Sequence, residues 1–338
     1  DVSTHTRMVV ESLLQLPEFH HQNEEDKFAL FMGCMLHDVE KRSTTFEEEG
    51  RIVSPGHAKK GERSARQILY REIPVPFQLR EKIAKIVRHH GLPLWIMDKP
   101  DPRKTIIEAS LVCNTQLLEI IAKADILGRI CPDADELFYK IELFKELAIE
   151  NNCYAQKRQF ASDLSRFRYF HSENSYPDYI PFDDRKFEVI VMCGIPGSGK
   201  DYYVKNNLKN YPVVSLDALR IEMDIEPGDK SATGTLIQTA KEKAREFMRK
   251  KQSFVWNGTN LTKQVRQQVI DLCEDYGGRI KLVYIEVPYK KVLHQNYNRE
   301  HPIPETVLER FINKLEMPLL SEAHQIRYVI DGVVQDEV

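Results

Sequence analysis

The residues with the clearest chemical potential form a glycine-rich stretch in the second half of the chain. A short apolar run ends at Cys193 and is followed by the sequence GIPGSGK. This spacing matches the phosphate-binding loop pattern G-x-x-x-x-G-K, between a buried strand and the start of a helix. Glycines let backbone N–H groups approach phosphate oxygens, and the helix N-terminus and the lysine add positive charge. We expect a nucleoside triphosphate to bind at Gly194, Ile195, Pro196, Gly197, Ser198, Gly199 and Lys200.

One position departs from this pattern. Asp201 stands where Ser or Thr would normally ligate Mg²⁺. An aspartate can hold Mg²⁺ directly or through water, so we expect NTP with Mg²⁺ here and take Asp201 as a candidate ligand. The alternative, a glycine-rich turn that binds nothing, conflicts with the agreement between glycine spacing, lysine and strand context.

A second chemical element follows the next predicted strand, at 213–216. Asp217 comes directly after it, at the carboxyl edge of the expected sheet. A carboxylate there can accept the proton of an attacking hydroxyl, and Arg220, one helical turn further, can bind a phosphate of the acceptor. The alternative role of Asp217 is to cap the following helix. We favour catalysis because the residue follows a phosphate loop at this distance.

Two later stretches are expected to line the same edge. In the stretch Trp256–Leu261 a strand runs into a helix, and its polar residues Asn257, Thr259 and Asn260 would line this edge, although Thr259 is also a typical N-cap residue. Residues 289–315 predict two helices joined by a polar segment, as in a lid. Arg299 in that segment could reach the donor phosphates and stabilise the transition state, or could be a solvated charge at a helix end.

The pattern around these residues predicts an α/β domain at 187–338. Short apolar runs alternate with helical patterns, which is typical of a parallel sheet covered by helices on both faces, with ligands at the carboxyl edge. The predicted strands span residues 187–193, 213–216, 254–256, 282–286 and 327–330.

The first half of the chain predicts an all-α domain at 1–153. Apolar residues recur at steps of three and four, and Gly and Pro separate these runs. Its chemical signal is a set of histidines and aspartates, several of them at the ends of predicted helices. In chain order they are His5, His37, Asp38, His57, His89, His90 and Asp125.

Imidazoles and carboxylates that converge from separate helices hold metal ions in helical bundles. A mixed N/O shell suits divalent first-row transition metals such as Mn²⁺, Ni²⁺ or Co²⁺. A single His on an apolar helix is more often a satisfied core residue, so the ordered set indicates the site more strongly than any member. The choice of ligand between His89 and His90 stays open, with His90 favoured. Lys41 and Arg129 are candidate phosphate contacts or else solvated helix charges.

The ordered set resembles the HD phosphohydrolase superfamily, whose ligands follow the order H…HD…H…H…D. The resemblance covers about residues 1–150, and the additional histidines make it similar to the two-metal version of that site. It implies that Asp38 bridges two ions, with Asp38 and Lys41 as catalytic residues. Such ions lower the pKa of a water and neutralise charge that develops at phosphorus.

The second half resembles the 5′-hydroxyl polynucleotide kinase family over about residues 187–320. The matching elements are the loop G-x-P-G-S-G-K, an S-x-D-x-x-R element at 215–220, the T-N-L element, and V-P…N-x-x-R at 287–299. The resemblance implies that Asp217 is the base, that Arg220 binds the acceptor phosphate and that Arg299 acts from the lid. Asp201 departs from the Ser or Thr of this family.

An HD module ahead of such a kinase is similar to the bacterial HD-Pnk end-healing enzymes. The resemblance implies phosphorylation of 5′-OH polynucleotide ends with NTP and Mg²⁺, and removal of phosphate from 2′,3′-cyclic, 2′- or 3′-phosphate ends. RNA or DNA ends would be the substrates, and a nucleic-acid ligase would act next. The alternatives are a small-molecule or nucleotide kinase fused to a nucleotide phosphohydrolase, and a non-catalytic nucleotide-sensing protein.

Composition sets the outer limits. The net charge of −3 offers no global positive field, so binding of nucleic acid would need a local groove. No apolar run approaches a membrane span, no signal peptide opens the chain, and six scattered cysteines are typical of free thiols, so we expect a cytoplasmic protein. Residues 154–186 predict a connection, with a charged helix at 155–170 whose basic and aromatic residues could track a nucleic-acid strand or pack on a neighbour.

Overall fold

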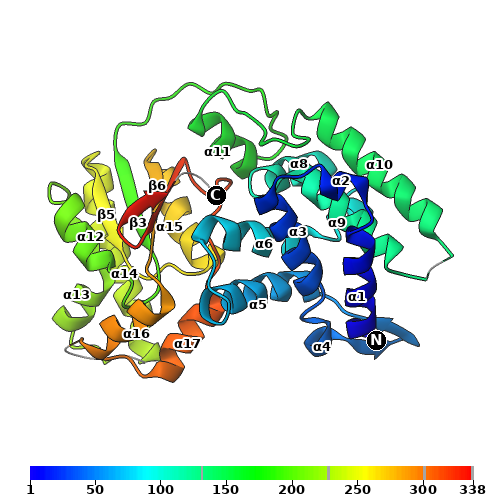
Figure 1. Ribbon diagram of the computed structural model, residues 1–338. Coiled ribbons are helices and arrows are strands. Elements are labelled where there is room, and N and C mark those ends of the chain that lie inside the picture. Colours follow the sequence, from blue (N-terminus) through cyan, green and yellow to red (C-terminus); the bar gives the residue numbers. More distant parts are fainter. Residues whose placement is uncertain (131, 227–228, 300–301, 336–338) are drawn as a thin grey trace. The chain divides into compact units, whose positions relative to one another are not determined.

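The computed structural model (Figure 1) describes residues 1–130, 132–226, 229–299 and 302–335. The chain divides into two compact units, residues 1–159 and the residues from 160 onward. This division falls inside the segment 154–186 that composition predicts as the connection. The domain limits 1–153 and 187–338 themselves stay predictions, and residues 336–338 lie outside the described part of the chain.

The first unit is built from helices, as predicted. They are α1 Val2–Leu13, α2 Pro17–His20, α3 Glu24–Leu36, α4 Lys41–Thr44, α5 His57–Arg71, α6 Phe77–His89, α7 Leu92–Trp95, α8 Pro102–Ser110, α9 Thr115–Leu127 and α10 Ala134–Glu150. One element was not predicted: strands β1 (Phe46–Glu48) and β2 (Arg51–Val53) form a small antiparallel hairpin between α4 and α5. Most of its residues are exposed, so it adds no apolar run that the sequence could reveal.

Helix packing in this unit brings the polar helix ends together. Helix α3 packs on α6, and α9 packs on both α1 and α10. Where α9 ends, Gly128 lies so close to α1 that a Cβ atom built there would be 2.6 Å from Val9. Glycine is therefore required for this approach. The contact sets the end of α9, which carries Asp125, against the helix that carries His5.

The second unit alternates strands and helices, which confirms the predicted α/β class. Its helices are α11 Asp163–His171, α12 Lys200–Asn207, α13 Leu216–Glu222, α14 Lys230–Arg249, α15 Lys263–Asp275, α16 Tyr289–Tyr297 and α17 Glu305–Lys314. Its strands are β3 Glu188–Cys193, β4 Val213–Ser215, β5 Phe254–Asn257, β6 Arg279–Glu286, β7 Gln325–Ile330 and β8 Val333–Gln335. They form one sheet in the order β4-β5-β3-β6-β7-β8.

All neighbouring strands of this sheet are parallel except the last pair, β7 and β8. The central strand β3 is buried along almost its whole length, as expected for a parallel strand covered on both faces. On one face Ile190 and Met192 pack with Val204 of α12. Helix α15 packs along β6. Because β3, β4 and β5 are parallel, their carboxyl ends share one edge, where the residues predicted to be functional follow.

The predicted charged helix at 155–170 is shorter than expected. Helix α11 begins after Ser162, whose side chain caps the helix by accepting a hydrogen bond from the backbone N–H of Ser165. Phe167 and Tyr169 are buried, and Arg166 donates hydrogen bonds to backbone carbonyls at Leu320 and His324. These contacts support the packing interpretation of this basic and aromatic stretch over the strand-tracking one.

The five described cysteines are buried free thiols, and Cys131 lies outside the described residues. Within the described parts of the chain, no single helix has the length and hydropathy to cross a bilayer, although the bent pair α8 and α9 would pass by length and composition alone.

Buried His324 is expected to make the stability of the second unit sensitive to acid. Its ring is fully buried, stacks on Phe167 and accepts a hydrogen bond at Nδ1 from the backbone N–H of Ile280. Burial, reinforced by Arg185 and Arg279, lowers the pKa of His324 from 6.5 to about 2. The folded state therefore resists protonation. The stability due to neutral His324 is complete above pH 6.5 and is lost as the pH falls towards 2.

We expect His324→Asn, which keeps a hydrogen-bond acceptor, to flatten the acid side of the stability profile. Between pH 6 and 4 the free energy of unfolding of the variant should fall by about 1.4 kcal/mol less per pH unit than that of the parent chain. Urea unfolding at a series of pH values measures this difference in slope. Equal slopes would show that His324 titrates normally in the folded protein.

Candidate metal centre and phosphate-binding loop

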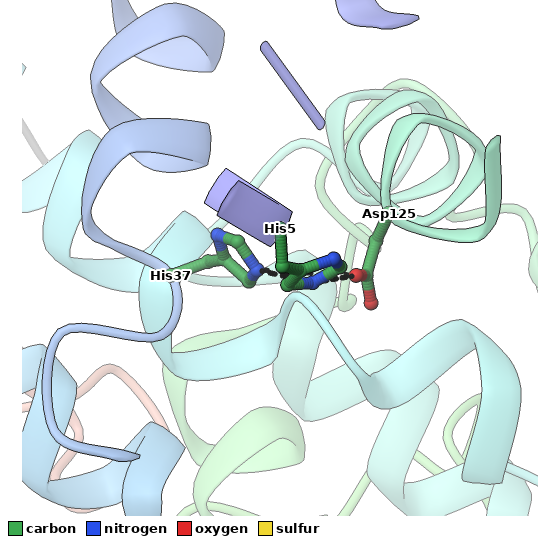
Figure 2. A group of neighbouring side chains, drawn as sticks. All are labelled: His5, His37 and Asp125. Carbon is green, nitrogen blue, oxygen red and sulfur yellow. Dashed lines mark hydrogen bonds and ion pairs between the residues drawn. The ribbon is translucent and has the colours of Figure 1, made fainter. Parts of the chain in front are cut away.

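Three of the predicted ligands meet at one point of the first unit. Figure 2 shows His5 from α1, His37 directly after α3, and Asp125 from α9, with their side chains turned towards one another. His5 Nε2 lies 3.0 Å from Asp125 Oδ1 and 3.4 Å from His37 Nε2. Helices far apart in the sequence therefore supply two imidazoles and one carboxylate with the spacing that a metal ion needs.

A second group lies beside the first and consists of Asp38, His57 and His90. His57 Nε2 lies 3.4 Å from His90 Nε2 and 3.6 Å from Asp38 Oδ1. The other oxygen of the same carboxylate, Asp38 Oδ2, lies 3.2 Å from His37 Nε2. Asp38 thus faces one group with each of its oxygens, which is the arrangement that a bridging ligand requires.

All four imidazoles are oriented in the same way. In His5, His37, His57 and His90, Nδ1 bonds to a backbone carbonyl, that of Gly128, Cys34, Ser54 and Val87 respectively. Only a protonated Nδ1 can donate to a carbonyl, so the neutral rings present unprotonated Nε2 atoms to the centre. Pairs of Nε2 lone pairs 3.4 Å apart repel each other unless a cation lies between them.

The two aspartates of the centre are also in the ionised state that binds a metal ion. Both oxygens of Asp38 are buried, and Oδ2 lies 2.7 Å from Lys41 Nζ and 3.2 Å from His37 Nε2. Burial raises the pKa of Asp38, but His37 and Lys41 outweigh it and hold that pKa well below its usual range. His5 and Arg129 do the same for Asp125. Burial lowers the pKa of His90 to about 4, whereas for His37 the charges of Asp38 and Asp125 outweigh burial and raise the pKa. Ionised carboxylates and neutral imidazoles are the states that bind metal, so the donor set fits two divalent cations.

His89 stands apart from both groups of described residues. It lines a pocket of about 830 Å³ beside the centre, together with His57, His90, Lys41 and Arg129. Lys41 Nζ lies 2.7 Å from Asp38 Oδ2, and Arg129 bonds to Asp125. The side chains of Lys41 and Arg129 therefore contact the carboxylates of Asp38 and Asp125 directly. The β1–β2 hairpin, which the sequence did not reveal, supplies Ile52 to the pocket wall.

In the second unit, the phosphate loop lies between β3 and α12, as the motif predicts. Gly194 has a φ of 145°, and a Cβ atom there would lie 2.5 Å from the carbonyl oxygen of Ile285. Only glycine fits next to the neighbouring strand in this conformation. Inside the loop, the Ser198 hydroxyl is buried without a hydrogen-bond partner among the described residues, as expected for a group that awaits a ligand.

The side chain of Lys200 folds back onto the first two residues of the phosphate loop. Its Nζ donates to the carbonyls of Gly194 and Ile195, each at 2.9 Å. Burial lowers the pKa of Lys200 to about 8, while Asp201 and Asp217 act to raise it and Arg299 acts to lower it. The charges of Asp201, Asp217 and Arg299 thus act on one ammonium, which means that residues predicted separately along the sequence surround the loop.

The lowered pKa of Lys200 predicts a pH dependence of nucleotide binding. A phosphate favours the charged ammonium, so binding raises the pKa from about 8 and takes up a proton at alkaline pH. Affinity for ATP should be full below pH 8 and fall by up to about tenfold per pH unit above it. Calorimetric titrations between pH 7 and 9.5 measure this fall. Lys200→Met should bind weakly at every pH, and a fall that persists in this variant would assign the titration elsewhere.

Asp201 has a partner that the motif does not include. Asn257, the last residue of β5, donates from Nδ2 to Asp201 Oδ1 at 2.7 Å. Asp217 lies in the first turn of α13 with its side chain 74% exposed, and Arg220 Nη1 approaches its Oδ1 at 3.3 Å. The N-cap role that was the alternative for Asp217 belongs to Ser215, so the carboxylate is not used as that cap.

Thr259 and Asn260 form hydrogen bonds with the end of β3 and the first residue of the phosphate loop. The backbone N–H of Gly194 donates to the carbonyl of Thr259, and Asn260 Nδ2 donates to the carbonyl of Met192. The cap of α15 is Thr262 and not Thr259. Arg266, fully buried and paired with Glu322, donates to the carbonyls at 260 and 261. Thr259 and Asn260 therefore fix the backbone at the end of β3, a role that the sequence pattern did not indicate.

The predicted lid corresponds to α16 and α17 and the segment between them, of which residues 300 and 301 lie outside the described part. Asn296 closes this segment, because its side chain donates to the carbonyl of Ile303 and accepts from the Ile303 N–H. Arg299 follows α16 and is exposed, within electrostatic reach of Lys200. This position is compatible with the predicted contact to donor phosphates.

Comparisons with known proteins match a family to each of the two units. Residues 2–130 match the HD domain family, and residues 189–318 match a family described as an AAA domain. A 168-residue stretch is 23% identical to a bifunctional polynucleotide phosphatase/kinase of Schizosaccharomyces pombe and covers 46% of this chain and 38% of that protein. The match thus spans well under half the length of this relative.

Solved structures that resemble part of the chain include a protein of Chloroflexus aurantiacus described as a kinase (14% identity, 44% of this chain and 87% of that chain, TM-score 0.38). Another is a gluconokinase of Sinorhizobium meliloti (19% identity, 43% of this chain and 83% of that chain, TM-score 0.32). The two family matches alone show that the chain joins an HD domain to a P-loop kinase-like domain of the AAA type, the order that the HD-Pnk resemblance predicts.

Proposed function

We propose that this protein is a bifunctional enzyme that repairs the ends of nucleic acids, with RNA as its main substrate. The HD unit removes phosphate from 2′,3′-cyclic, 2′- or 3′-phosphate ends, and the P-loop unit transfers the γ-phosphate of an NTP to a 5′-OH end. The observation that carries the proposal is the position of Asp38, which belongs to one three-residue ligand group and also faces the other, in a chain that also holds a phosphate loop. The similarity to a bifunctional polynucleotide phosphatase/kinase supports nucleic-acid ends as the substrates.

In the HD unit, His5, His37 and Asp125 would hold one divalent ion and His57 and His90 a second, with Asp38 shared between them. Bound ions of this kind supply a Lewis acid and a hydroxide at neutral pH. The chain itself fixes each imidazole through its Nδ1–H and keeps both carboxylates ionised. Lys41 and Arg129, which line the pocket, add positive charge where a phosphate would enter. Mn²⁺, Ni²⁺ and Co²⁺ fit this nitrogen-rich shell.

In the P-loop unit, Lys200 would exchange its bonds to the loop carbonyls for bonds to the β- and γ-phosphates. Asp217 Oδ would accept the proton of the 5′-hydroxyl, and Arg220 beside it would bind a phosphate of the acceptor strand. Arg299 would contact the donor phosphates from the lid. Asp201, positioned by Asn257, is the candidate ligand for Mg²⁺.

The two activities would yield 5′-phosphate and unmodified 3′ ends, the ends that a nucleic-acid ligase requires. The test is a pair of assays on the full chain: transfer from labelled ATP to a 5′-OH oligonucleotide or to nucleosides, and phosphate release from an oligonucleotide with a 2′,3′-cyclic phosphate. We expect both activities on oligonucleotides. Transfer to nucleosides alone would favour a small-molecule kinase, and ATP binding without any transfer would favour a nucleotide sensor, for which Asp201 is the supporting observation.

A further inference from the structure

The pocket beside the metal centre extends beyond the groups assigned above. Its lining includes Trp95, the last residue of α7, only five residues after His90. Apolar side chains of Ile52, Leu92 and Leu94 line the pocket with it. The pocket lining therefore combines ligand residues and cations with an indole ring and aliphatic side chains. A terminal nucleotide likewise combines a charged phosphate with an apolar, planar base.

Trp95 is held in place and yet accessible. Leu92 and Leu94 on either side of Pro93 are buried, and Leu94 belongs to a core cluster that includes Ile126 of α9. Trp95 is nevertheless 49% exposed, so its ring is accessible from the pocket that it lines. Lys140 Nζ lies 4.9 Å from the ring centroid and restricts the ring further through a cation–π contact. A rigid, half-exposed aromatic ring is suited to stacking.

We propose that Trp95 binds the base of the terminal nucleotide and thereby makes the HD site selective for phosphates at polynucleotide ends over base-free phosphate esters. This inference rests on the proposed phosphoesterase activity of the same site. Stacking requires a base that is free of its duplex partner, so the site would prefer single-stranded ends of any sequence. Arg88 and Lys99, which also line the pocket, are placed to contact the phosphates of the preceding nucleotides.

Kinetics on two matched substrates test the proposal. One is a single-stranded oligonucleotide with a terminal 3′-phosphate, and the other is identical except that its last nucleotide lacks the base. The parent chain should show a KM roughly tenfold or more lower for the substrate with the base, since stacking contributes on the order of one factor of ten or more per base. Trp95→Ala should abolish this difference with little change in kcat, and Trp95→Phe should retain most of it.

Met97→Ala is the matched control, because Met97 is 52% exposed in the same segment and does not line the pocket. It should preserve the difference between the two substrates. If Trp95→Ala also preserves it, the proposed stacking role is wrong.

Fluorescence separates this inference from the proposed activity. The chain has two tryptophans, and the other, Trp256, is buried at 2% exposure in the second unit. Binding of the 3′-phosphate oligonucleotide in the presence of a chelator, without turnover, should quench the emission of Trp95. The quench should be absent in Trp95→Phe, which reports Trp256 alone. Quenching without phosphate release under any metal would refute the phosphoesterase and keep the base site. Phosphate release without quenching would refute the base site alone.

Discussion

The variant Asp38→Ala is expected to lose phosphate release from 2′,3′-phosphate ends and to keep phosphate transfer to 5′-OH ends. Asp38 Oδ2 lies near His37 and Lys41, and its Oδ1 lies near His57, so this carboxylate links both ligand groups. Loss of a partner outside the coordination shell costs roughly 10- to 100-fold in activity, and loss of a shared ligand should cost at least the upper value. Rates of both reactions, and metal content by mass spectrometry, measure the effect.

The histidine pair at the end of α6 provides the matched control. His90→Ala should reproduce the loss, because His90 Nε2 faces His57 Nε2 at 3.4 Å. His89→Ala, one residue away and outside both groups, should cost much less. Equal losses from both variants would mean that the helix end, rather than a ligand, is what the substitutions damage. Loss of the kinase as well in Asp38→Ala would point to a folding defect.

The structure brings six of the seven predicted metal ligands together, and the sequence signal for them is local. His37, His57 and His90 each lie within one residue of a helix end, and helix ends follow from apolar periodicity and from Gly and Pro. The choice between His89 and His90 needed the structure. Consecutive helical residues point about 100° apart, and only the packing of α6 on α3 and α5 decides which one faces the centre.

Residues whose role depends on distant partners were not predictable. Asn257 belongs to the polar stretch that was expected at this edge, but its hydrogen bond to Asp201, 56 positions earlier in the chain, has no signal in the sequence. The hairpin at 46–53 forms part of the pocket, but its strands have three residues each and lack a buried face. The assignment of Thr259 to the site edge was correct in place, but its contribution is a backbone carbonyl, which any residue could supply.

Asp217→Ala is expected to reduce phosphate transfer to a 5′-OH oligonucleotide by about 10²- to 10⁴-fold, the range lost with a general base. Asp217 is exposed, and its contact among the described residues is a 3.3 Å approach from Arg220, so we expect its substitution to affect chemistry and not the fold. ATP binding should stay within about twofold, because Lys200 and the loop backbone contact the phosphates. Quench-flow transfer from labelled ATP, with calorimetry for ATP binding, separates the two.

Glu222→Gln is the control for this substitution, because Glu222 is a carboxylate at the end of the same helix, α13, and pairs with Lys243. It should leave transfer unchanged. Asp217→Asn should resemble Asp217→Ala, because an amide cannot accept a proton as a carboxylate does. The amide keeps the shape of the side chain and weakens its contact with Arg220. Transfer within threefold of the parent chain in Asp217→Asn would exclude Asp217 as the base, and would direct attention to Asp201 as the remaining carboxylate that acts on Lys200.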